Sequence, residues 1–595
     1  MRQAHFLRSN KGNQAPTLIV AFDTETDSVP VGIDVVEARL AFGWLAVSRR
    51  HRGSSWSSPK WHRFDTPDAF WEMVNRETRL GWRIVLAAHN VGFDFRVVQG
   101  FSSLVRDGWE CVGAVIDDPP TILRYRKGRR SMLILDTLNY YRVSLAELGA
   151  SIGLPKIEHD LVWGDREKDD AYCKRDAEIV LRAMTGLIDR VRDLDLGNFA
   201  YTFPSLAFGT FRHRHLKHPV LIDDNPKALE IARSGYYGGR TEPFRIGPVH
   251  ATVSVYDVNS LYPSVMQTTK VPTILRGVWT RLSTDRLREI LVDGTAIADV
   301  TVQTEQSDYP LARDGRLLFP VGEFRTTLPG PELGHALSLD HIIKIHRVAV
   351  YESAEIFRTY VDEWYGRRLE ARAAGDVALE SFCKYMLNAL YGKFGQRGET
   401  WDSVGETDLS DVRRWIEVDA QTREVRHYRS LGGIIQLQSG EKEARDSHPA
   451  IAATITSAAR MVLLDYMNMA GRPFVVYVDT DSVFVLNGPA QRQLAPRVGS
   501  QLGQLKLERT LRNLTIYSPK DYAADGYEKH KGIRKNAVLL APGKYAQDMF
   551  EGLAGAVQRG DVNRQLIYRT EKTLHRQYQK GTVDASGFVH PFRLG

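Results

Sequence analysis

The alternation of apolar and polar positions separates the chain into two unlike parts. In the first part, short β-branched runs alternate with a long stretch whose apolar residues recur at helical spacing. The runs predict strands at 17–27, 82–90 and 131–141, and the helical spacing predicts a helix at 170–194. Because strands that alternate with helices are typical of α/β layers, we expect one such layer to end near Leu194.

The second part mixes strands, loops and longer helices. Its predicted elements are a strand at 253–260, a helical hairpin of 354–374 and 377–395 broken at Gly375, and a helix at 448–469. The polar, glycine-punctuated stretch 397–448 is typical of an insertion. The apolar run VVYVDTDSVFVL at 475–486 predicts a buried strand, yet Asp479 and Asp481 lie in its middle. Burying two like charges is costly, so these acids need a compensating partner.

Composition narrows the class of protein without naming a function. The chain has 595 residues, of which 43% are hydrophobic and 25% charged, and this fits a globular protein of several domains. Its formal net charge of +7 favours a polyanionic partner. Cys111, Cys173 and Cys383 form no C-x-x-C pair, which argues against a disulfide framework or zinc ribbon and favours a reducing compartment such as the cytoplasm. No apolar run approaches the length of a membrane span, so we expect no membrane partner.

Four acids of the first part follow separate predicted elements. Asp23 and Glu25 share one face at the end of a strand, Asp94 follows the next strand, and Asp176 lies on the helix one turn from Tyr172. Converging carboxylates can hold two divalent cations about 4 Å apart, which activate water and stabilise the leaving oxygen in phosphodiester hydrolysis. Oxygen ligands favour Mg²⁺ or Mn²⁺ over zinc. Taken singly, each acid is equally consistent with a cap or a solvated loop.

The ordered set FDTET, NVGFD and YCKRD resembles the three motifs of the DEDD exonuclease superfamily, in the tyrosine-bearing form of the proofreading domains of family B DNA polymerases. The resemblance implies an RNase H-like domain whose metal ligands are Asp23, Glu25, Asp94 and Asp176. It also implies that Tyr172 orients the attacking water and that Lys156, in GLPK, stabilises the scissile phosphate. Residues implied to contact a single strand are Asn90 and Phe93, with Thr26 and Thr137 as weaker candidates; a structural hydroxyl is the alternative for Thr137.

A second set of acids calls for similar chemistry. Asp257 ends a predicted strand in VYDVNSLYPS, and Asp479 and Asp481 lie in the run described above. Two cations can bridge an incoming triphosphate and a primer 3′-hydroxyl, and they offset clustered negative charge. In one strand, Asp479 and Asp481 face one side and Thr480 the other. D-T-D alone fits the turn of a hairpin equally well.

The order of three motifs distinguishes these alternatives. DVNSLYPS, KYMLNALYG and YVDTDS follow one another as motifs A, B and C do in family B DNA polymerases, and with the nuclease motifs this resemblance covers about Leu18 to Asn536. It implies a right-hand polymerase domain (palm, fingers and thumb) with a ferredoxin-like palm, and it favours a hairpin at the third motif. The implied metal ligands are Asp257, Asp479 and Val258, with Asp481 either a ligand or a neighbouring support. DNA template-primer and deoxynucleoside triphosphates are the implied partners, and two Mg²⁺ per active site the implied cofactor, with Mn²⁺ as an alternative.

Residues around these motifs are implied to contact the nucleotide. Lys384, Asn388 and Tyr391 share one helix face, so Lys384 can hold triphosphate oxygens while Tyr391 and Gly392 lie beside the nascent base pair. Tyr262 matches the steric gate, whose ring clashes with a ribose 2′-hydroxyl. Further implied nucleotide contacts are Ser260, Leu261, Arg367 and Arg368. The alternative is that one of the two arginines faces solvent.

Two other segments resemble DNA-binding motifs of the family. SGYYGGR resembles the Y-x-G-G/A linker between the nuclease and polymerase regions, and SPKDYA resembles the K-x-Y motif that grips the primer. A tight turn and a solvated basic loop are the respective alternatives. The residues implied to contact DNA are Tyr236, Gly238, Gly239, Gly392, Thr480, Lys520, Tyr522 and, in KHKGIRKN, Lys531.

The compact layout resembles the protein-primed polymerases of bacteriophages, linear plasmids and mobile elements. In that branch the first insertion meets a terminal protein, and the second confers strand displacement and processivity. The implied domains are exonuclease 1–195, palm 196–270, first insertion 271–354, fingers 355–396, second insertion 397–448, palm 449–538 and thumb 539–595. Protein-primed initiation with a terminal protein is thus a hypothesis. Its alternatives are DNA-primed or primer-independent synthesis, or an exonuclease with an inactive polymerase-like region.

Overall fold

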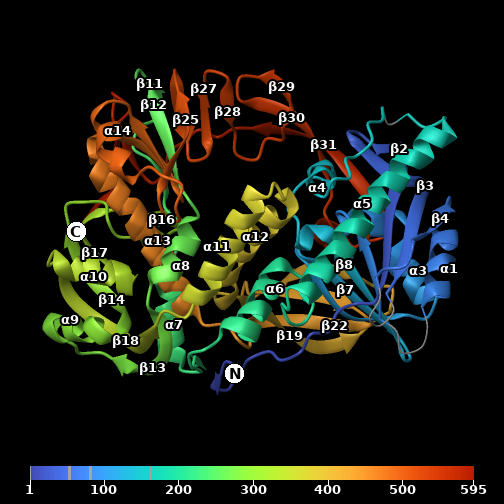
Figure 1. Cartoon of the computed structure of the whole chain (residues 1–595), viewed down its shortest axis with the longest axis horizontal. Helices are drawn as coiled ribbons and strands as arrows, with labels where there is room; N and C mark the ends of the chain where they lie inside the picture. The colour runs from blue at the N-terminus through green and yellow to red at the C-terminus, as the bar shows by residue number, and fades with distance from the viewer. Residues whose placement is uncertain (1, 51–54, 79–82, 161) are drawn as a thin grey trace.

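The computed structural model describes residues 2–50, 55–78, 83–160 and 162–595. Figure 1 shows the N-terminal layer at one end of the molecule and the strands β13–β18 at the other, with the helices α11 (Arg358–Ala373) and α12 (Val377–Phe394) between them. The predicted helical hairpin is therefore confirmed. Trp82, the first residue of one predicted strand, lies outside the described residues.

The N-terminal layer is a mixed sheet covered by one long helix. Its central strands are parallel, with β2 pairing β5 and β5 pairing β8, and their apolar runs are buried. Helix α5 packs on β2 and β3. These elements are β2 (Leu18–Gly32), β3 (Val35–Arg49), β5 (Arg83–Ala88), β8 (Arg130–Asp136) and α5 (Arg166–Asp193).

The expectation that Asp23 and Glu25 end a strand is wrong. Strand β2 continues beyond them because its pairing with β3 extends to Gly32, opposite Val35. The two acids therefore lie in the middle of a long hairpin, and they still share one face because side chains alternate along a strand.

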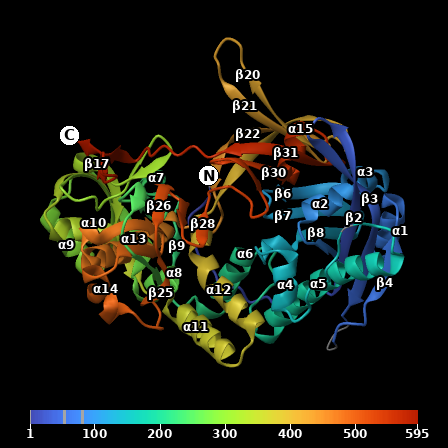
Figure 2. The same ribbon diagram turned by 90° about the horizontal axis from the view of Figure 1, so that it is seen from above.

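The C-terminal region completes the N-terminal sheet. Strand β31 (Gln565–Thr573) pairs with β3, β30 (Lys544–Phe550) pairs with β31, and β29 (Val538–Ala541) forms the edge. Residues 574–595 then cross back, as Figure 2 shows, and β34 (Arg593–Leu594) pairs with β17 of the first insertion. The segment predicted as the thumb is thus divided among several neighbours.

A five-stranded antiparallel sheet, in the order β10-β23-β24-β12-β25, forms the centre of the second part. Strands β23 and β24 pair as a hairpin, so the interpretation of 475–486 as a hairpin is confirmed and that of one continuous strand is wrong. Thr480 turns the chain with a φ of +66°. The strands are β10 (Thr241–Pro243), β12 (Val253–Val258), β23 (Val475–Asp479), β24 (Ser482–Leu486) and β25 (Leu505–Leu511).

Helix α13 (Pro449–Ala470) packs against β24, α8 (Leu261–Thr268) and α12. By length and composition α13 is apolar enough to cross a membrane, which corrects the expectation that no run approaches that length. Most of the helix is buried inside the protein, as expected for a core helix, because its apolar side chains face neighbouring elements on all sides.

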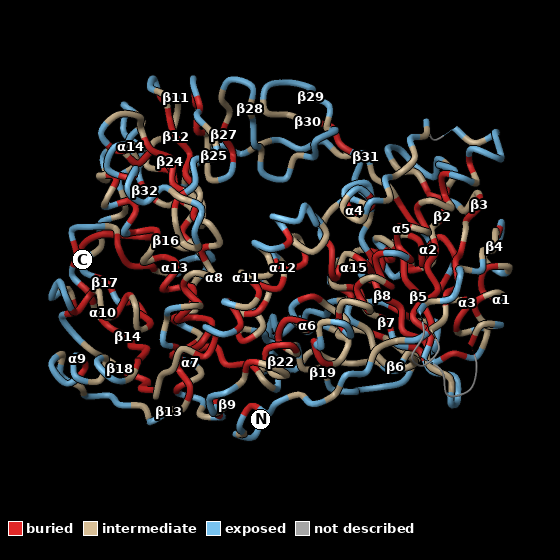
Figure 3. Tube along the Cα trace, in the orientation of Figure 1, coloured by how far each residue is buried: buried red, intermediate tan, exposed pale blue. Residues whose placement is uncertain are grey.

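The two predicted insertions have separate sheets. The first contains β13 (Val271–Trp279), β14 (Thr295–Thr304), β17 (Val321–Pro329) and β18 (Ile342–Ala354), with α9 (Thr284–Asp293) and α10 (Gly330–Ser338). The second contains β19 (Arg397–Glu406), β20 (Arg413–Val418), β21 (Val425–Leu431) and β22 (Ile434–Glu443). In Figure 2 β20 and β21 project from the molecule, and most residues of the second insertion's strands are exposed or half-buried. Figure 3 shows buried segments in the N-terminal layer and around α13.

Candidate nuclease and nucleotidyl-transfer sites

The four acids of the first part converge on one buried cluster. One side-chain ligand atom each of Asp23, Glu25 and Cys173 lies within 4.8 Å of the others. Asp94 accepts hydrogen bonds at Oδ1 from the Thr24 backbone N–H (3.1 Å) and from the Thr24 hydroxyl (2.6 Å). Because β2, α2 (Val91–Val97) and α5 each supply a side chain, the layer itself sets the spacing of the carboxylates.

The charges of this cluster are poorly balanced by the protein. Burial, together with repulsion from the neighbouring acids, raises the pKa of Asp23 well above its usual range and that of Glu25 to about 8. Burial also raises the pKa of Asp94 to about 7. Lys156 forms an ion pair with Asp176 Oδ2, and its positive charge opposes the pKa shifts of Asp23 and Glu25.

The donor set of this cluster fits divalent cations. Among the described residues, the buried Oδ1 atom of Asp176 has no hydrogen-bond partner, while Oδ2 is taken by Lys156. An orphaned carboxylate oxygen beside repelling carboxylates is stabilised by added positive charge. Oxygen donors predominate, which favours a hard cation, and the Cys173 thiol, with its pKa raised by burial, is the exception in the set.

The remaining residues predicted for this site surround the acids. The Lys156 ammonium lies 4.4 Å from the centre of the Tyr172 ring. Asn90 has a φ of +64° and donates its backbone N–H to Asp136 Oδ1 (3.0 Å), which fixes the start of α2. The Phe93 ring meets the Phe550 ring edge-on at 6.1 Å. Thr137 is buried, bonded to His89 and to the Ala88 carbonyl, whereas Thr26 lines the cavity described next.

A cavity of about 610 Å³ extends from Glu25 and Phe93 towards the C-terminal hairpin. Its lining also includes Trp163, Phe550 and Arg569, which the motifs did not indicate. Trp163 lies in no motif of the sequence, and its aromatic character alone does not indicate a role in a site. Phe550 and Arg569 lie on β30 and β31, and only the long-range pairing of those strands with β3 brings them here.

The second set of acids lines one small cavity of about 190 Å³ on the central sheet. Asp257 from β12, Asp479 from β23 and Asp481 from the turn face it together with Glu508 from β25. The Val258 N–H donates to the Asp481 carbonyl at 2.8 Å, which ties the first motif to the turn. Sequence reasoning missed Glu508, because no strand was predicted at Leu505–Leu511 and the pairing of β25 with β12 is irregular at this residue.

Asp479 has the most partners of these acids. The Thr241 hydroxyl donates to its Oδ1 at 3.0 Å, and the ammonium groups of Lys520 and Lys529 lie 3.5 Å and 3.4 Å from its two oxygens. Among the described residues Asp257 forms no such ion pair. Burial, then repulsion by Asp481 and Glu508, raises its pKa to about 7. Burial also raises the pKa of Asp481. Carboxylates that repel one another around a small polar cavity fit divalent cations.

The described lining of this cavity includes none of the residues predicted to hold the nucleotide, several of which contact one another instead. The Tyr262 and Tyr391 rings stack at 4.6 Å with an angle of 10° between their planes. Arg368 Nη1 donates to Ser260 Oγ at 2.9 Å, whereas Arg367 forms an ion pair with Glu363.

The other three residues of this predicted group belong to helices. Lys384 lowers the pKa values of both Asp257 and Asp481, so its charge faces the acids. Asn388 donates to the Lys384 carbonyl within α12, and Leu261 is buried at the start of α8.

The residues predicted to contact DNA divide into packed and open positions. The Tyr236 ring packs on Gly395, and a Cβ on Gly239 would lie 2.7 Å from Thr480 Cγ2, so Gly239 permits a close approach to the turn. Tyr522 is buried against Tyr477 and Phe484. The remaining members have open or exposed surroundings: Gly238, Gly392, Lys520 and Lys531.

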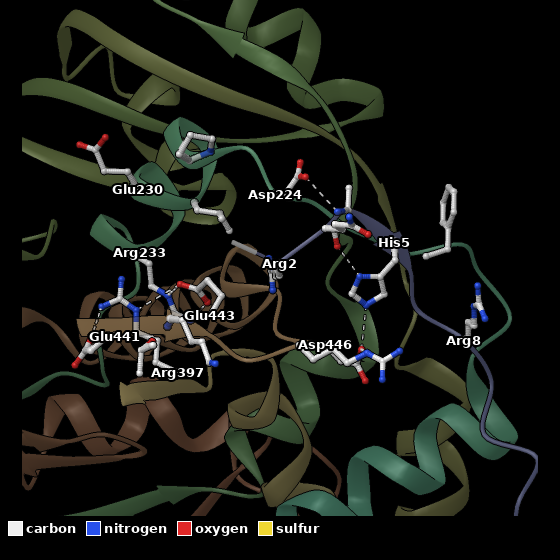
Figure 4. Close-up of a pocket in the computed structure, with 18 of the residues that line it drawn as sticks. Arg2, His5, Arg8, Asp224, Glu230, Arg233, Arg397, Glu441, Glu443 and Asp446 are labelled. Carbon is white, nitrogen blue, oxygen red and sulfur yellow. Dashed lines mark hydrogen bonds and ion pairs between the residues drawn. The ribbon is translucent and has the colours of Figure 1, made fainter. Parts of the chain in front are cut away.

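A larger cavity, about 1080 Å³, lies apart from both acid clusters. It is formed by the N-terminal segment, α7 (Pro226–Ser234) and the base of the second insertion. Figure 4 shows its charged side chains pairing with one another, as in Arg233 with Glu443 and His5 with Asp446. Mutual pairing of the lining charges indicates a junction between elements rather than an anion site.

Comparisons with known proteins bear on the family and the fold of the chain. The family described as DNA polymerase type B, organellar and viral, matches residues 158–427. The DNA-directed DNA polymerase of Enterobacteria phage PRD1 is 30% identical over 314 residues, which are 53% of each chain. Over these residues the chain is similar to type B DNA polymerases of viruses and organelles. The resemblance inferred from the motifs is thus confirmed.

More distant relatives extend over most of the chain. The DNA polymerase of Bacillus phage M2 is 22% identical over 467 residues, covering 71% of this chain and 69% of the relative. The structure of Phi29 DNA polymerase with single-stranded DNA aligns with a TM-score of 0.67 at 15% identity, covering 94% of this chain and 100% of that one. The fold is therefore the multidomain fold of that polymerase. The chain spans about half the length of the PRD1 relative.

Proposed function

We propose that the protein is a DNA-directed DNA polymerase with an intrinsic 3′→5′ exonuclease, and that its two acid clusters are separate active sites. The observation that carries the proposal is the convergence of Asp257, Asp479 and Asp481 on one cavity, with Lys384 electrostatically coupled to it. The solved Phi29 relative has been described with primer-template DNA and incoming nucleotide substrates. In this reading the central sheet is a palm, α11 and α12 are fingers, and the N-terminal layer is an RNase H-like exonuclease domain.

The residues of the polymerase site have distinct roles in this proposal. Asp257, Asp479 and Asp481 hold two Mg²⁺ ions, which when bound activate the primer 3′-hydroxyl and neutralise the triphosphate. Lys384 and Arg368 bind triphosphate oxygens. The charge of Lys384 acts on Asp257 and Asp481, and Arg368 donates a hydrogen bond to Ser260, which belongs with Asp257 to motif A. The stacked Tyr262 and Tyr391 rings form the floor beneath the sugar and base.

The exonuclease site follows the same principle with different side chains. Asp23, Glu25, Asp94 and Asp176 hold cations. Tyr172 orients water, and Lys156, which lies over its ring, stabilises the phosphate. Asn90 and Phe93 bind the 3′ end of a single strand. The Phi29 relative is described in complex with single-stranded DNA, which supports such a substrate here.

The insertions support a more specific hypothesis. The second insertion presents Trp401 beneath the Arg429 guanidinium (4.2 Å), and its Trp415 and Tyr428 rings stack at 5.4 Å. Aromatic and arginine side chains on an exposed sheet are suited to bases and phosphates of a displaced strand. We therefore include strand displacement by this insertion in the proposal. Protein-primed initiation at the first insertion is included from the compact layout of the motifs alone, with DNA-primed synthesis as the alternative.

Separate inactivation of the two sites tests the proposal. Asp479→Ala is expected to abolish primer extension with Mg²⁺ and to leave degradation of single strands intact. Asp23→Ala combined with Glu25→Ala is expected to do the reverse. Failure of the wild-type protein to extend a primer, or loss of both activities in a folded single-site variant, would overturn the assignment of two sites. Initiation without a primer, with and without a candidate terminal protein, tests the priming mode.

A further inference from the structure

Two buried arginines connect the first insertion to the segment Tyr236–Arg240. The Arg240 side chain donates twice to Glu242 Oε2 (2.9 and 2.7 Å), and its remaining N–H groups donate to the Ser307 carbonyl (2.8 Å) and hydroxyl (3.1 Å). Its guanidinium also lies 4.2 Å from the centre of the Phe319 ring. Ser307 and Phe319 belong to the first insertion, so Arg240 is held from outside the central sheet.

Arg460, on α13, makes a matching connection from the other side. It forms a two-pronged ion pair with Glu332 of the first insertion, at 2.7 and 2.8 Å, and both side chains are almost completely buried. Its Nη1 donates to the carbonyls of Tyr237 (2.9 Å) and Gly238 (2.8 Å). At one end of this segment the backbone is held by Arg460, whose guanidinium is paired with Glu332 of the insertion. At the other end the insertion holds the Arg240 side chain through Ser307.

The backbone of Arg240 reaches the turn that carries the proposed metal ligands. Its carbonyl accepts the Thr480 N–H at 2.7 Å, and Thr480 occupies the left-handed region that a non-glycine residue rarely adopts. The next residue, Thr241, pairs with Asp479 and donates its hydroxyl to that carboxylate. A conformation of this kind persists when its surroundings hold it in place, and the Arg240 carbonyl is one of the groups that do so.

From this chain of contacts we infer that Arg240 is a positioning residue through which the first insertion sets the geometry of the turn Asp479–Asp481. The inference rests on the proposed polymerase function. It assigns the first insertion a role in DNA synthesis, in addition to any role in binding a partner protein. Ser307 and Phe319 of the insertion hold the Arg240 side chain, and the Arg240 main chain holds the turn. The nuclease cluster makes none of these contacts among the described residues.

Three variants and a control test this role. Arg240→Met removes every side-chain bond, and Arg240→Lys retains the charge but lacks the planar fork that reaches Glu242 and Ser307 together. Phe319→Leu loosens the guanidinium without touching the central sheet. Arg325→Met is the matched control, because Arg325 lies on the same insertion and pairs with Asp299 away from the turn.

The readouts separate positioning from general instability. Hydrogen–deuterium exchange of peptides covering residues 476–483 includes the Thr480 amide and needs neither substrate nor metal. We expect faster exchange there in Arg240→Met and an increase of about tenfold in the Mg²⁺ concentration for half-maximal primer extension. Arg240→Lys and Phe319→Leu are expected to shift both quantities less, and the control to shift neither. The Mg²⁺ requirement of single-strand degradation is expected to stay unchanged in all four.

The outcomes distinguish this inference from the proposed function. Wild-type protein that extends no primer refutes the proposed function. Wild-type protein that extends primers, together with a folded Arg240→Met variant of unchanged exchange and unchanged Mg²⁺ requirement, overturns the inference alone. An equal change in the nuclease Mg²⁺ requirement also overturns it, because general loosening then explains the effect. If Arg240→Met does not fold, Phe319→Leu decides the question by the same two measurements.

Discussion

Replacing Thr24 with valine removes one hydrogen bond from the proposed nuclease site while keeping the shape of the side chain. The lost bond is the 2.6 Å contact from the Thr24 hydroxyl to Asp94 Oδ1. A hydrogen bond to an ionised carboxylate contributes about 1.5–3 kcal/mol, or roughly 10- to 150-fold in an equilibrium constant. Since the Thr24 N–H still donates to the same oxygen at 3.1 Å, we expect the lower end, about a tenfold loss of affinity for the catalytic cation.

The assay is degradation of a labelled single strand over a range of Mg²⁺ concentrations. Thr24→Val is expected to raise the Mg²⁺ needed for half-maximal degradation about tenfold and to leave primer extension unchanged. Thr185→Val is the matched control, because the Thr185 hydroxyl is also buried but bonds the Leu181 carbonyl of its own helix. A Thr24→Val profile that coincides with the wild type, or one shared by the control, would refute the role of Asp94 as a cation ligand.

Two further predictions address sugar selection and acid stability. Tyr262→Val removes the ring stacked on Tyr391, so incorporation of ribonucleotides relative to deoxyribonucleotides is expected to rise in single-nucleotide extension, and an unchanged ratio contradicts the gate. Burial lowers the pKa of His448 from its ordinary 6.5 to about 3. Between these pH values the unfolded chain binds more protons than the folded protein, so the free energy of unfolding decreases as the pH falls from 6.5 towards 3. Between pH 7.5 and 5 this costs about 2 kcal/mol, and denaturant unfolding of His448→Phe is expected to show a correspondingly smaller loss; equal losses in both proteins contradict the assignment.

Local pattern predicted the elements that depend on neighbours in sequence. The helical hairpin was predictable because Gly375 separates two long helical stretches, and the structure places the break there with a φ of +70°. The hairpin at Asp479–Asp481 could not be settled by periodicity, since both of its strands are apolar and only one residue separates the acids. The order of the motifs, rather than local propensity, pointed to the correct interpretation.

Contacts between distant segments could not be predicted from one sequence. Glu508 faces the same cavity as Asp257 because β25 pairs with β12, although their strands are far apart in the chain. Phe550 meets Phe93 because the C-terminal hairpin joins the N-terminal sheet. The contacts of Arg240 were also unpredictable, because Ser307 and Phe319, which hold its guanidinium, lie in an insertion whose sequence shows no motif.

The pairing of β31 with β3 has a consequence for how the chain is made. Glu37 on β3 and its partner Arg564, just before β31, are 527 residues apart. At about 5–20 residues per second, the ribosome needs roughly half a minute or more to supply the second strand after the first. Until then Val35–Ala38 of β3 lack their partner strand, because β4 (Lys60–Phe64) pairs with Gly43–Val47 further along β3. An unpaired edge of this kind can associate with other chains. We therefore expect residues 1–195 made alone to aggregate more readily than the full chain, and newly made full-length chains to depend on chaperones until the last strands emerge.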